Sequence, residues 1–295
     1  MNGILSFLKP LNPNPDSKWQ KYFKDNEVLL QIDKDVRRLC PDISFFQQAT
    51  EFPHEKITVY NHLRLHKRVE FSVLNYANVT RKGLGMSKLT LTTKKTNEEY
   101  LPLPEGQEAH WEVVERILFI YAMLNPGQSY VQGMNEIVGP IYYTFASNPN
   151  NEWREFAEAD TFFCFTNLMS EIRDFFIKTL DDSDYGIVGL MNRLMNAVRE
   201  NDFQLWKQLE QQELKPQFFS FRWLTLLLSS RISTSRLNVI RVWDSLFADE
   251  KRFTFLLHVC CSIVLRDRIL GSDFSTNMKM LQKNLQNTKS IYEIY

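Results

Sequence analysis

The fold is decided by residues 107–124, which read QEAHWEVVERILFIYAML. Apolar side chains recur in this stretch at intervals of three and four residues, at Trp111, Val114, Leu118 and Tyr121. This period is typical of an amphipathic α-helix with one face on a core. The sequence Asn125-Pro126-Gly127 follows directly and predicts the end of the helix.

The same period appears on both sides of this stretch. Before it, we predict a helix that Asp16 or Ser17 can cap and that Pro41 ends, because a residue before proline is pushed out of the helical region. After it, we predict helices near residues 131–145, 158–180, 186–199, 202–212, 218–228, 239–247, 253–265 and 273–286. No strand pattern and no repeat of 20 to 50 residues competes, so we expect an all-α protein.

Composition supports a folded chain and argues against some partners. Hydrophobic residues make up 44% of the 295 residues, which is enough for a sizeable core. Glycine is scarce, at 10 residues, which favours helices over a turn-rich β protein. Basic and acidic side chains balance at 35 each, whereas a nucleic-acid binder carries a basic excess. We therefore expect no nucleic-acid partner.

The cysteines and the N-terminus bear on the compartment. Cys164 and the Cys260-Cys261 pair lie in apolar sequence, and no CxxC pair occurs. This pattern predicts buried free thiols in a reducing compartment, and neither disulfides nor zinc ligands. The first ten residues are too short and interrupted for a signal sequence or a membrane span. We expect a soluble, cytoplasmic protein.

The weakest helical pattern lies at about 47–105. Between residues 71 and 97 the basic residues are Arg81, Lys82, Lys88, Lys94 and Lys95, and there is no acid. We interpret the range as a polar, mobile insertion, with contact to an acidic partner or a membrane surface as the alternative. The expected organisation is an irregular segment at 1–16 and one domain at 17–290.

The first candidate site is Ile32-Asp33-Lys34-Asp35-Val36-Arg37-Arg38. On a helix Asp35 and Arg38 are i, i+3 neighbours, so the carboxylate can hold the guanidinium in one extended conformation. Ile32 would face the core and fix the helix beneath them. The alternative is structural, because cations such as Arg37 and Arg38 are favoured at a helix C-terminus.

The second candidate site is Ser129-Tyr130-Val131-Gln132-Gly133-Met134-Asn135-Glu136. It places the Gln132 amide at a predicted helix start, beside the ring of Tyr130. The alternative is again structural, because Ser129 and Gln132 have the spacing of a capping box.

Other chemistry has weaker support. There is no G-x-S-x-G motif and no credible Cys–His pair, so no self-contained catalytic set is evident. His62 and His66 stand at i, i+4 with Glu55 nearby, but no third ligand has convincing spacing, so we expect no metal site.

Together the two candidate motifs resemble those of the TBC-domain family of Rab GTPase-activating proteins. The matching residues are Ile32, Asp35 and Arg38 in I-x-x-D-x-x-R, and Tyr130, Gln132, Gly133, Met134 and Asn135 in Y-x-Q-G-M-N. Supporting similarity comes from residues 116–126, 221–224 and 239–244. The order of these motifs spans most of the chain, and the two principal motifs together are highly specific.

The resemblance implies a multi-helix TBC-type domain that regulates an enzyme and is not itself one. Arg38 would enter the site of a GTP-bound Rab GTPase, and Gln132 would orient the attacking water. The chain would need no cofactor of its own, because the partner holds GTP and Mg²⁺. Such a protein would regulate vesicle trafficking and be recruited from the cytoplasm to membranes through the Rab.

One departure from the family bears on activity. The family carries an R-x-x-x-W motif before its arginine, whereas Trp19 has no arginine four residues earlier. The resemblance therefore implies an amino-terminally shortened domain. The alternative function is a non-catalytic Rab-binding scaffold.

Overall fold

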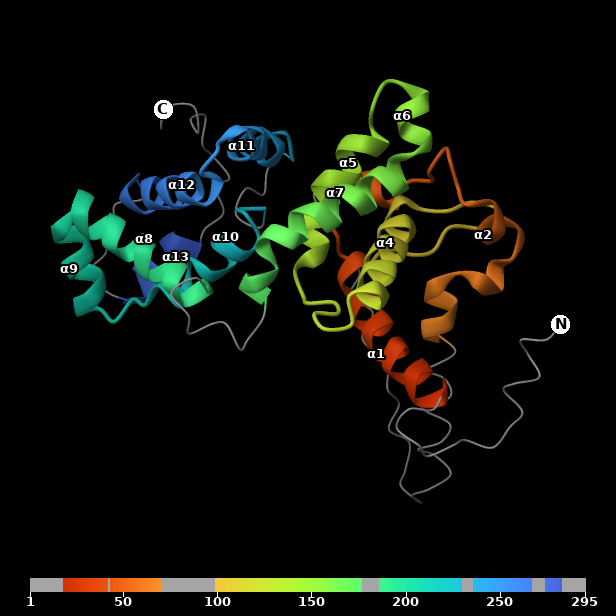
Figure 1. The fold of residues 1–295 in the computed structure, drawn as a ribbon, viewed down its shortest axis with the longest axis horizontal. Helices are drawn as coiled ribbons and strands as arrows, with labels where there is room; N and C mark the ends of the chain where they lie inside the picture. The colour runs from red at the N-terminus through yellow and green to blue at the C-terminus, as the bar shows by residue number, and fades with distance from the viewer. Residues whose placement is uncertain are drawn as a thin grey trace, which may run out of the picture. The chain divides into compact units, whose positions relative to one another are not determined.

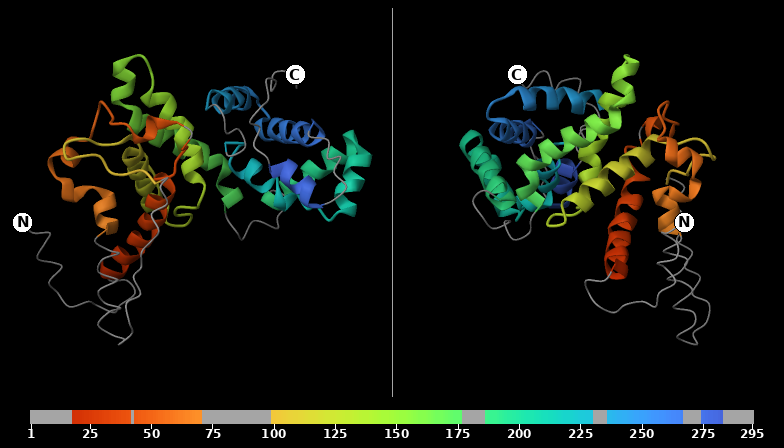
Figure 2. Two further views of the ribbon diagram at one scale, coloured as in Figure 1. Left: turned by 180° about the vertical axis from the view of Figure 1, so that it is seen from behind. Right: turned by 45° about the vertical axis from the view of Figure 1, so that its right-hand side comes forward.

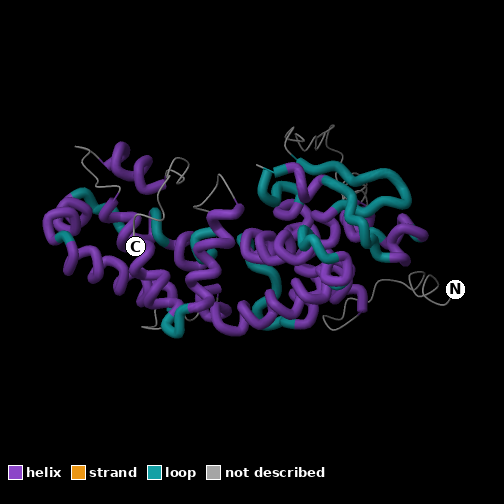
Figure 3. Tube along the Cα trace, turned by 90° about the horizontal axis from the view of Figure 1, so that it is seen from above, coloured by secondary structure: helices purple, strands orange, loops and turns teal. Residues whose placement is uncertain are grey.

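The computed structural model describes residues 18–41, 43–70, 99–176, 186–229, 236–266 and 274–282. In these ranges the regular structure is helical, as Figure 3 shows, and the only β-type pairing is one isolated antiparallel bridge between Ala49 and Ala109. The prediction of an all-α protein is confirmed.

The chain divides into two compact units, residues 1–135 and residues 136–295. The helices of the first unit are α1 (Lys18–Val36), η2 (Ser44–Gln47), α2 (Glu55–Val59), η3 (Asn61–Leu63), a helix at 65–70 and α4 (His110–Leu124). The boundary falls in the first turn of α5 (Met134–Ala146).

The core of the first unit forms where α1 packs against α4 (Figure 1). Leu29 and Ile32 of α1, and Trp111, Val114 and Leu118 of α4, are completely buried. Full burial of one such side chain stabilises a fold by about 1.5–3 kcal/mol. This contact holds the C-terminal end of α1 in place.

The second unit contains the rest of α5 and a further set of helices (Figure 2). These are α6 (Asn151–Glu155), α7 (Ala157–Ile172), η4 (Arg173–Phe176), α8 (Ile187–Asn201), α9 (Phe203–Gln211), η6 (Pro216–Phe218), α10 (Phe221–Thr225), α11 (Arg236–Ala248), α12 (Arg252–Arg266) and α13 (Phe274–Gln282). Helix α8 packs against α9, α10 and α12, and its Leu190, Leu194 and Val198 are buried.

The predicted buried helix at 218–228 is wrong in its extent. Helix α10 covers only Phe221–Thr225, and Leu227 and Leu228 have positive φ angles of 50° and 64°. The Leu228 N–H donates to the Trp223 carbonyl at 2.8 Å, and the Trp243 indole N–H donates to the Leu227 carbonyl at 2.8 Å. These bonds satisfy the backbone of a tight turn, which an unbroken apolar run does not reveal.

Two further expectations differ from the structure. Cys260 and Cys261 are buried free thiols as predicted, but Cys164 is exposed because it lies on the outer side of α7. Within the range predicted as a mobile insertion, residues 55–59, 61–63 and 65–70 are helical, and Arg64 and His66 are buried. Residues 71–98, with the five basic residues, lie outside the described residues.

Candidate functional site

The turn that directly follows α1 presents Arg38 to solvent. The side chain of Arg38 is 53% exposed, whereas that of Asp35 is 9% exposed. Arg38 Nε donates to the Lys34 carbonyl at 3.1 Å, and its Nη2 lies 3.6 Å from Asp35 Oδ1. The inner edge of the guanidinium is thus held, while much of the side chain remains accessible.

The neighbouring arginine, Arg37, is bound inside the first unit. Its Nε lies 2.9 Å from both carboxylate oxygens of Asp33, and its Nη1 donates to the Tyr100 carbonyl at 3.1 Å. The guanidinium also lies over the Trp111 ring, 4.8 Å from the centroid. Arg37 therefore links α1 to Tyr100 and to Trp111 of α4. Of the two arginines, Arg38 is the one that another molecule can reach.

The second candidate motif forms a tight loop before α5. The turn after α4 brings the Ser129 N–H to the Asn125 carbonyl at 2.7 Å, and Ser129 has a φ of 57°. Gly133 has a φ of 105°, a conformation that favours glycine. Gln132 lies between these two positions, and its side chain is exposed.

The capping-box alternative for Gln132 is wrong. We predicted a helix from about residue 131, but α5 begins at Met134, so Ser129 is too early to be its N-cap. The Gln132 amide makes no hydrogen bond to a described residue. Capping therefore does not explain a glutamine at this position.

Three buried groups join the two motifs. The Tyr130 hydroxyl donates to Asp35 Oδ2 at 2.7 Å, across 95 positions of the sequence. The Asn135 amide donates to the Asp35 backbone carbonyl at 3.4 Å, and Tyr130 Oη lies 3.4 Å from Asn135 Oδ1. Asp35 thus contacts the second motif with Oδ2 and Arg38 with Oδ1. All these residues lie in the first unit.

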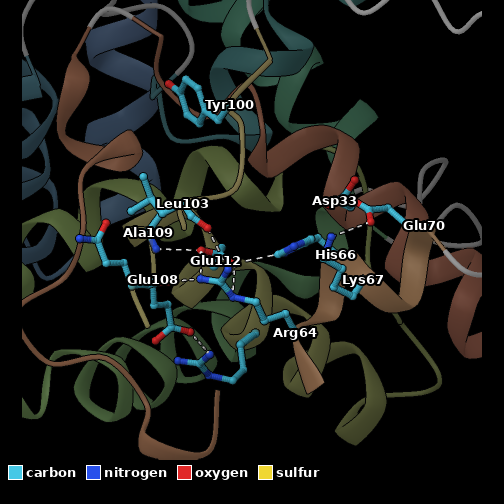
Figure 4. Close-up of polar contacts among 12 residues, drawn as sticks. Asp33, Arg64, His66, Lys67, Glu70, Tyr100, Leu103, Glu108, Ala109 and Glu112 are labelled. Atoms are coloured by element: carbon cyan, nitrogen blue, oxygen red, sulfur yellow. Dashed lines mark hydrogen bonds and ion pairs between the residues drawn. The ribbon is translucent and has the colours of Figure 1, made fainter. Parts of the chain in front are cut away.

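A buried polar cluster braces the start of α4 (Figure 4). Glu112 accepts from the Ala109 N–H at 2.8 Å and pairs with Arg64 at 3.3 Å and with His66 at 3.1 Å. Arg64 also donates to the Leu103 carbonyl at 3.1 Å. The cluster fastens the segment around residue 64 to α4, and α4 in turn supports α1. Sequence reasoning missed it, because its partners are distant in sequence.

Two carboxyl groups near Arg37 have perturbed pKa values. Burial raises the pKa of Glu115 well above its usual range, and the adjacent Asp33 charge raises it further. Burial also raises the pKa of Asp33, against the opposing effect of Arg37. Glu115 therefore favours its protonated form, which avoids an unpaired buried charge beside the Asp33–Arg37 pair.

The exposed groups have a limited chemistry of their own. Arginine offers a permanently charged planar fork for anionic oxygens, and an amide can orient a water molecule, but neither is a nucleophile or a general base. In the described ranges no group of three or more His, Cys, Asp or Glu could hold a metal ion. In the same ranges no helix is long and apolar enough to cross a membrane.

Comparison with known proteins shows which family this chain belongs to. The family described as RabGAP-TBC, Rab-GTPase-TBC domain, matches residues 92–270. TBC1 domain family member 13 of Mus musculus is 60% identical over 281 residues, covering 92% of this chain and 70% of the relative. Member 13 of Homo sapiens is 59% identical over the same shares. Residues 31–42 and 110–118 predict this likeness to member 13, which is confirmed.

A solved structure is similar in fold. The crystal structure of the Ypt/Rab-GAP domain of Gyp1p aligns with a TM-score of 0.56 and 22% sequence identity, covering 95% of each chain. At this identity the likeness concerns the fold alone.

Proposed function

Because the chain belongs to the Rab-GTPase-TBC domain family, we propose that it stimulates GTP hydrolysis by a Rab-type small GTPase. Arg38 enters the partner's nucleotide site and neutralises charge that develops on the phosphates. Gln132 orients the attacking water. The partner supplies GTP and Mg²⁺, so the chain contributes only these two side chains and the surface that positions them.

One observation carries the proposal. The Arg38 motif and the Gln132 motif are joined through the bonds of Asp35 with Tyr130 and Asn135, while both Arg38 and Gln132 are exposed. Phosphoryl transfer has a charge-dispersed transition state, so positioned charge and positioned water supply most of the catalysis. The exposed Arg38 cation can supply the charge, and the exposed Gln132 amide can position the water. The buried bonds of Asp35 hold the two motifs together.

The cellular setting follows from the partner. A Rab that is attached to a membrane would recruit this chain to that membrane, and faster GTP hydrolysis would limit the time that the Rab stays active. We therefore propose a regulator of vesicle trafficking that visits membranes from the cytoplasm.

Single-turnover GTP hydrolysis with a panel of Rab GTPases tests the proposal. We expect Arg38→Ala to lower the stimulated rate by about 10³-fold or more, as for other arginine fingers. Gln132→Ala should also lower it strongly. Arg38→Lys should remain impaired, because lysine keeps the charge but loses the planar fork. Circular dichroism should show unchanged helix content in each variant.

Arg173→Ala and Gln211→Ala are matched controls, because both positions are exposed and lie in the second unit. Both should retain the parent's rate. If a folded preparation stimulates no Rab at all, the proposal fails. If it binds a GTP-loaded Rab while hydrolysis stays at the intrinsic rate, the chain is a Rab-binding scaffold.

A further inference from the structure

The exposed side of α1 carries a row of residues that leads to Arg38, which stands in the turn directly after the helix. The row consists of Lys24, Glu27, Gln31, Lys34 and Arg38, all of them exposed. Their spacing alternates between three and four, so they follow one line along the helix. At 1.5 Å per residue the row is about 21 Å long. Arg38 is therefore the end of an extended surface.

The charges of α1 are segregated between its two sides. Asp33 and Asp35 are buried and bound to Arg37 and to Tyr130. The lysines Lys18, Lys21, Lys24 and Lys34 are all exposed, and none of them makes an ion pair with a described residue. Glu27 is the one exposed carboxylate among the described residues of this helix, and Asp25 is half-buried. Lys18 and Lys21 lie on other faces of the helix, but on the row itself Lys24, Lys34 and Arg38 outnumber Glu27, so the row is basic.

The stability of the helix does not account for this pattern. α1 has no acidic residue in its first turn, which contains Lys18 and Lys21, and Lys24 follows in the second. Cations near a helix N-terminus oppose the helix dipole and are mildly unfavourable. Only Lys34, near the C-terminus, is favourably placed. The helix dipole therefore does not favour Lys18 or Lys21, and it has little effect on Lys24, which lies beyond the first turn.

We propose that the basic row, defined as Lys24, Lys34 and the exposed residues between them, binds an acidic face of the GTPase beside its nucleotide site. The inference rests on the proposed function and extends it from the reacting residues to partner docking. A GTPase that receives Arg38 must cover the end of α1. Because a folded domain is much wider than one helical turn, it would also contact the basic row.

The size and sign of the row suit this role. From Lys24 to Lys34 a strip about 15 Å by 10 Å covers roughly 150 Å², about a fifth of the 800 Å² that one partner buries in a standard interface. Complementary charge at an interface raises the association rate and selects among partners. Acidic GTPases should therefore be preferred over GTPases whose corresponding face is neutral or basic.

Steady-state hydrolysis assays with a GTPase that the wild type stimulates test the inference. We expect Lys24→Glu/Lys34→Glu to raise KM about tenfold at low salt and to leave kcat within about twofold. The neutral pair Lys24→Gln/Lys34→Gln should raise KM about threefold. Both effects should shrink in 0.5 M NaCl, because salt screens exposed charges. The control Lys207→Glu/Lys251→Glu makes the same charge change at exposed positions of the second unit and should leave KM unchanged.

The outcomes distinguish failure of the docking inference from failure of the proposed function. If the wild type stimulates hydrolysis but the α1 pair leaves KM unchanged, the docking inference fails and the proposed function stands. If the wild type binds GTP-loaded Rab without stimulation, the same variants are compared by Kd, and an unchanged Kd overturns the inference. If no Rab is bound or stimulated, both fail. Loss of sedimentation with phosphatidylserine vesicles, with KM unchanged, would make the row a lipid-binding surface instead.

Discussion

Asp35 determines how Arg38 and the second motif are positioned. It is buried, it accepts the Tyr130 hydroxyl at 2.7 Å, and its other oxygen lies 3.6 Å from Arg38. A hydrogen bond to a charged group stabilises a fold by about 1.5–3 kcal/mol. A change at Tyr130 should therefore disturb both stability and the orientation of Arg38.

Tyr130→Phe tests this positioning role. The substitution keeps the buried ring and removes the donor to Asp35, so we expect the free energy of unfolding to fall by about 1.5–3 kcal/mol. The kcat for stimulated hydrolysis should fall about tenfold, with KM changed much less. Tyr142→Phe, at a buried tyrosine of α5, is the control and should leave kcat unchanged. A purely structural role for Tyr130 would lower stability alone.

Glu115 makes stability depend on pH. Its pKa is raised in the folded state, so between the unfolded and folded pKa values the folded state binds more protons. Stability is then lost as pH rises through this window. We expect Glu115→Gln, which cannot ionise, to lose less stability than the wild type between pH 5 and pH 8 in urea unfolding. Parallel pH profiles for the two proteins would contradict this account.

The loop between α4 and α5 is the element that presents Gln132. Its path depends on the left-handed conformation of Gly133, with a φ of 105°. Side chains are strained in that conformation, and the loop has little freedom because Tyr130 and Asn135 on its two sides are both bound to Asp35.

Gly133→Ala should therefore strain the loop and move Gln132. We expect a stability loss of about 1–3 kcal/mol and a reduced rate of stimulated hydrolysis. Gly127→Ala is the matched control, because Gly127 lies in the same connection, lacks a positive φ and has open space where a Cβ would stand. Equal effects of the two substitutions on the rate would show that the Gly133 conformation is unimportant.

Sequence patterns predict elements better than the contacts between them. The period of 107–124 predicts α4 closely, because one face of that helix is buried along its whole length. The motifs also predict Arg38 and Gln132 as site residues, and both side chains are exposed. The turn at Leu227 and Leu228 and the bond from Tyr130 to Asp35 escape prediction, because each depends on groups that only the folded chain brings together.

At the scale of the whole molecule, the residues proposed to act on GTP all lie in the first of two compact units. Each unit has its own buried core, around Leu118 of α4 and around Leu194 of α8. Regions with separate cores commonly open as separate cooperative units.

Hydrogen exchange on two core variants tests this division. Leu194→Ala should speed amide exchange in α8, α9 and α12 and leave α1 and α4 protected. Leu118→Ala should do the reverse. Each truncation should lower stability by about 2–5 kcal/mol. Faster exchange throughout the chain in either variant would show that the two units unfold together.

The buried carboxyl of Glu115 also makes folding a proton-uptake reaction. At a pH between the unfolded and folded pKa values of Glu115, the unfolded chain has released this proton, so unfolding transfers it to the buffer. The heat measured in calorimetry then includes the heat of protonating that buffer. The apparent enthalpy of unfolding should be smaller in Tris, which binds protons with a large release of heat, than in phosphate. In Glu115→Gln the difference between the two buffers should decrease.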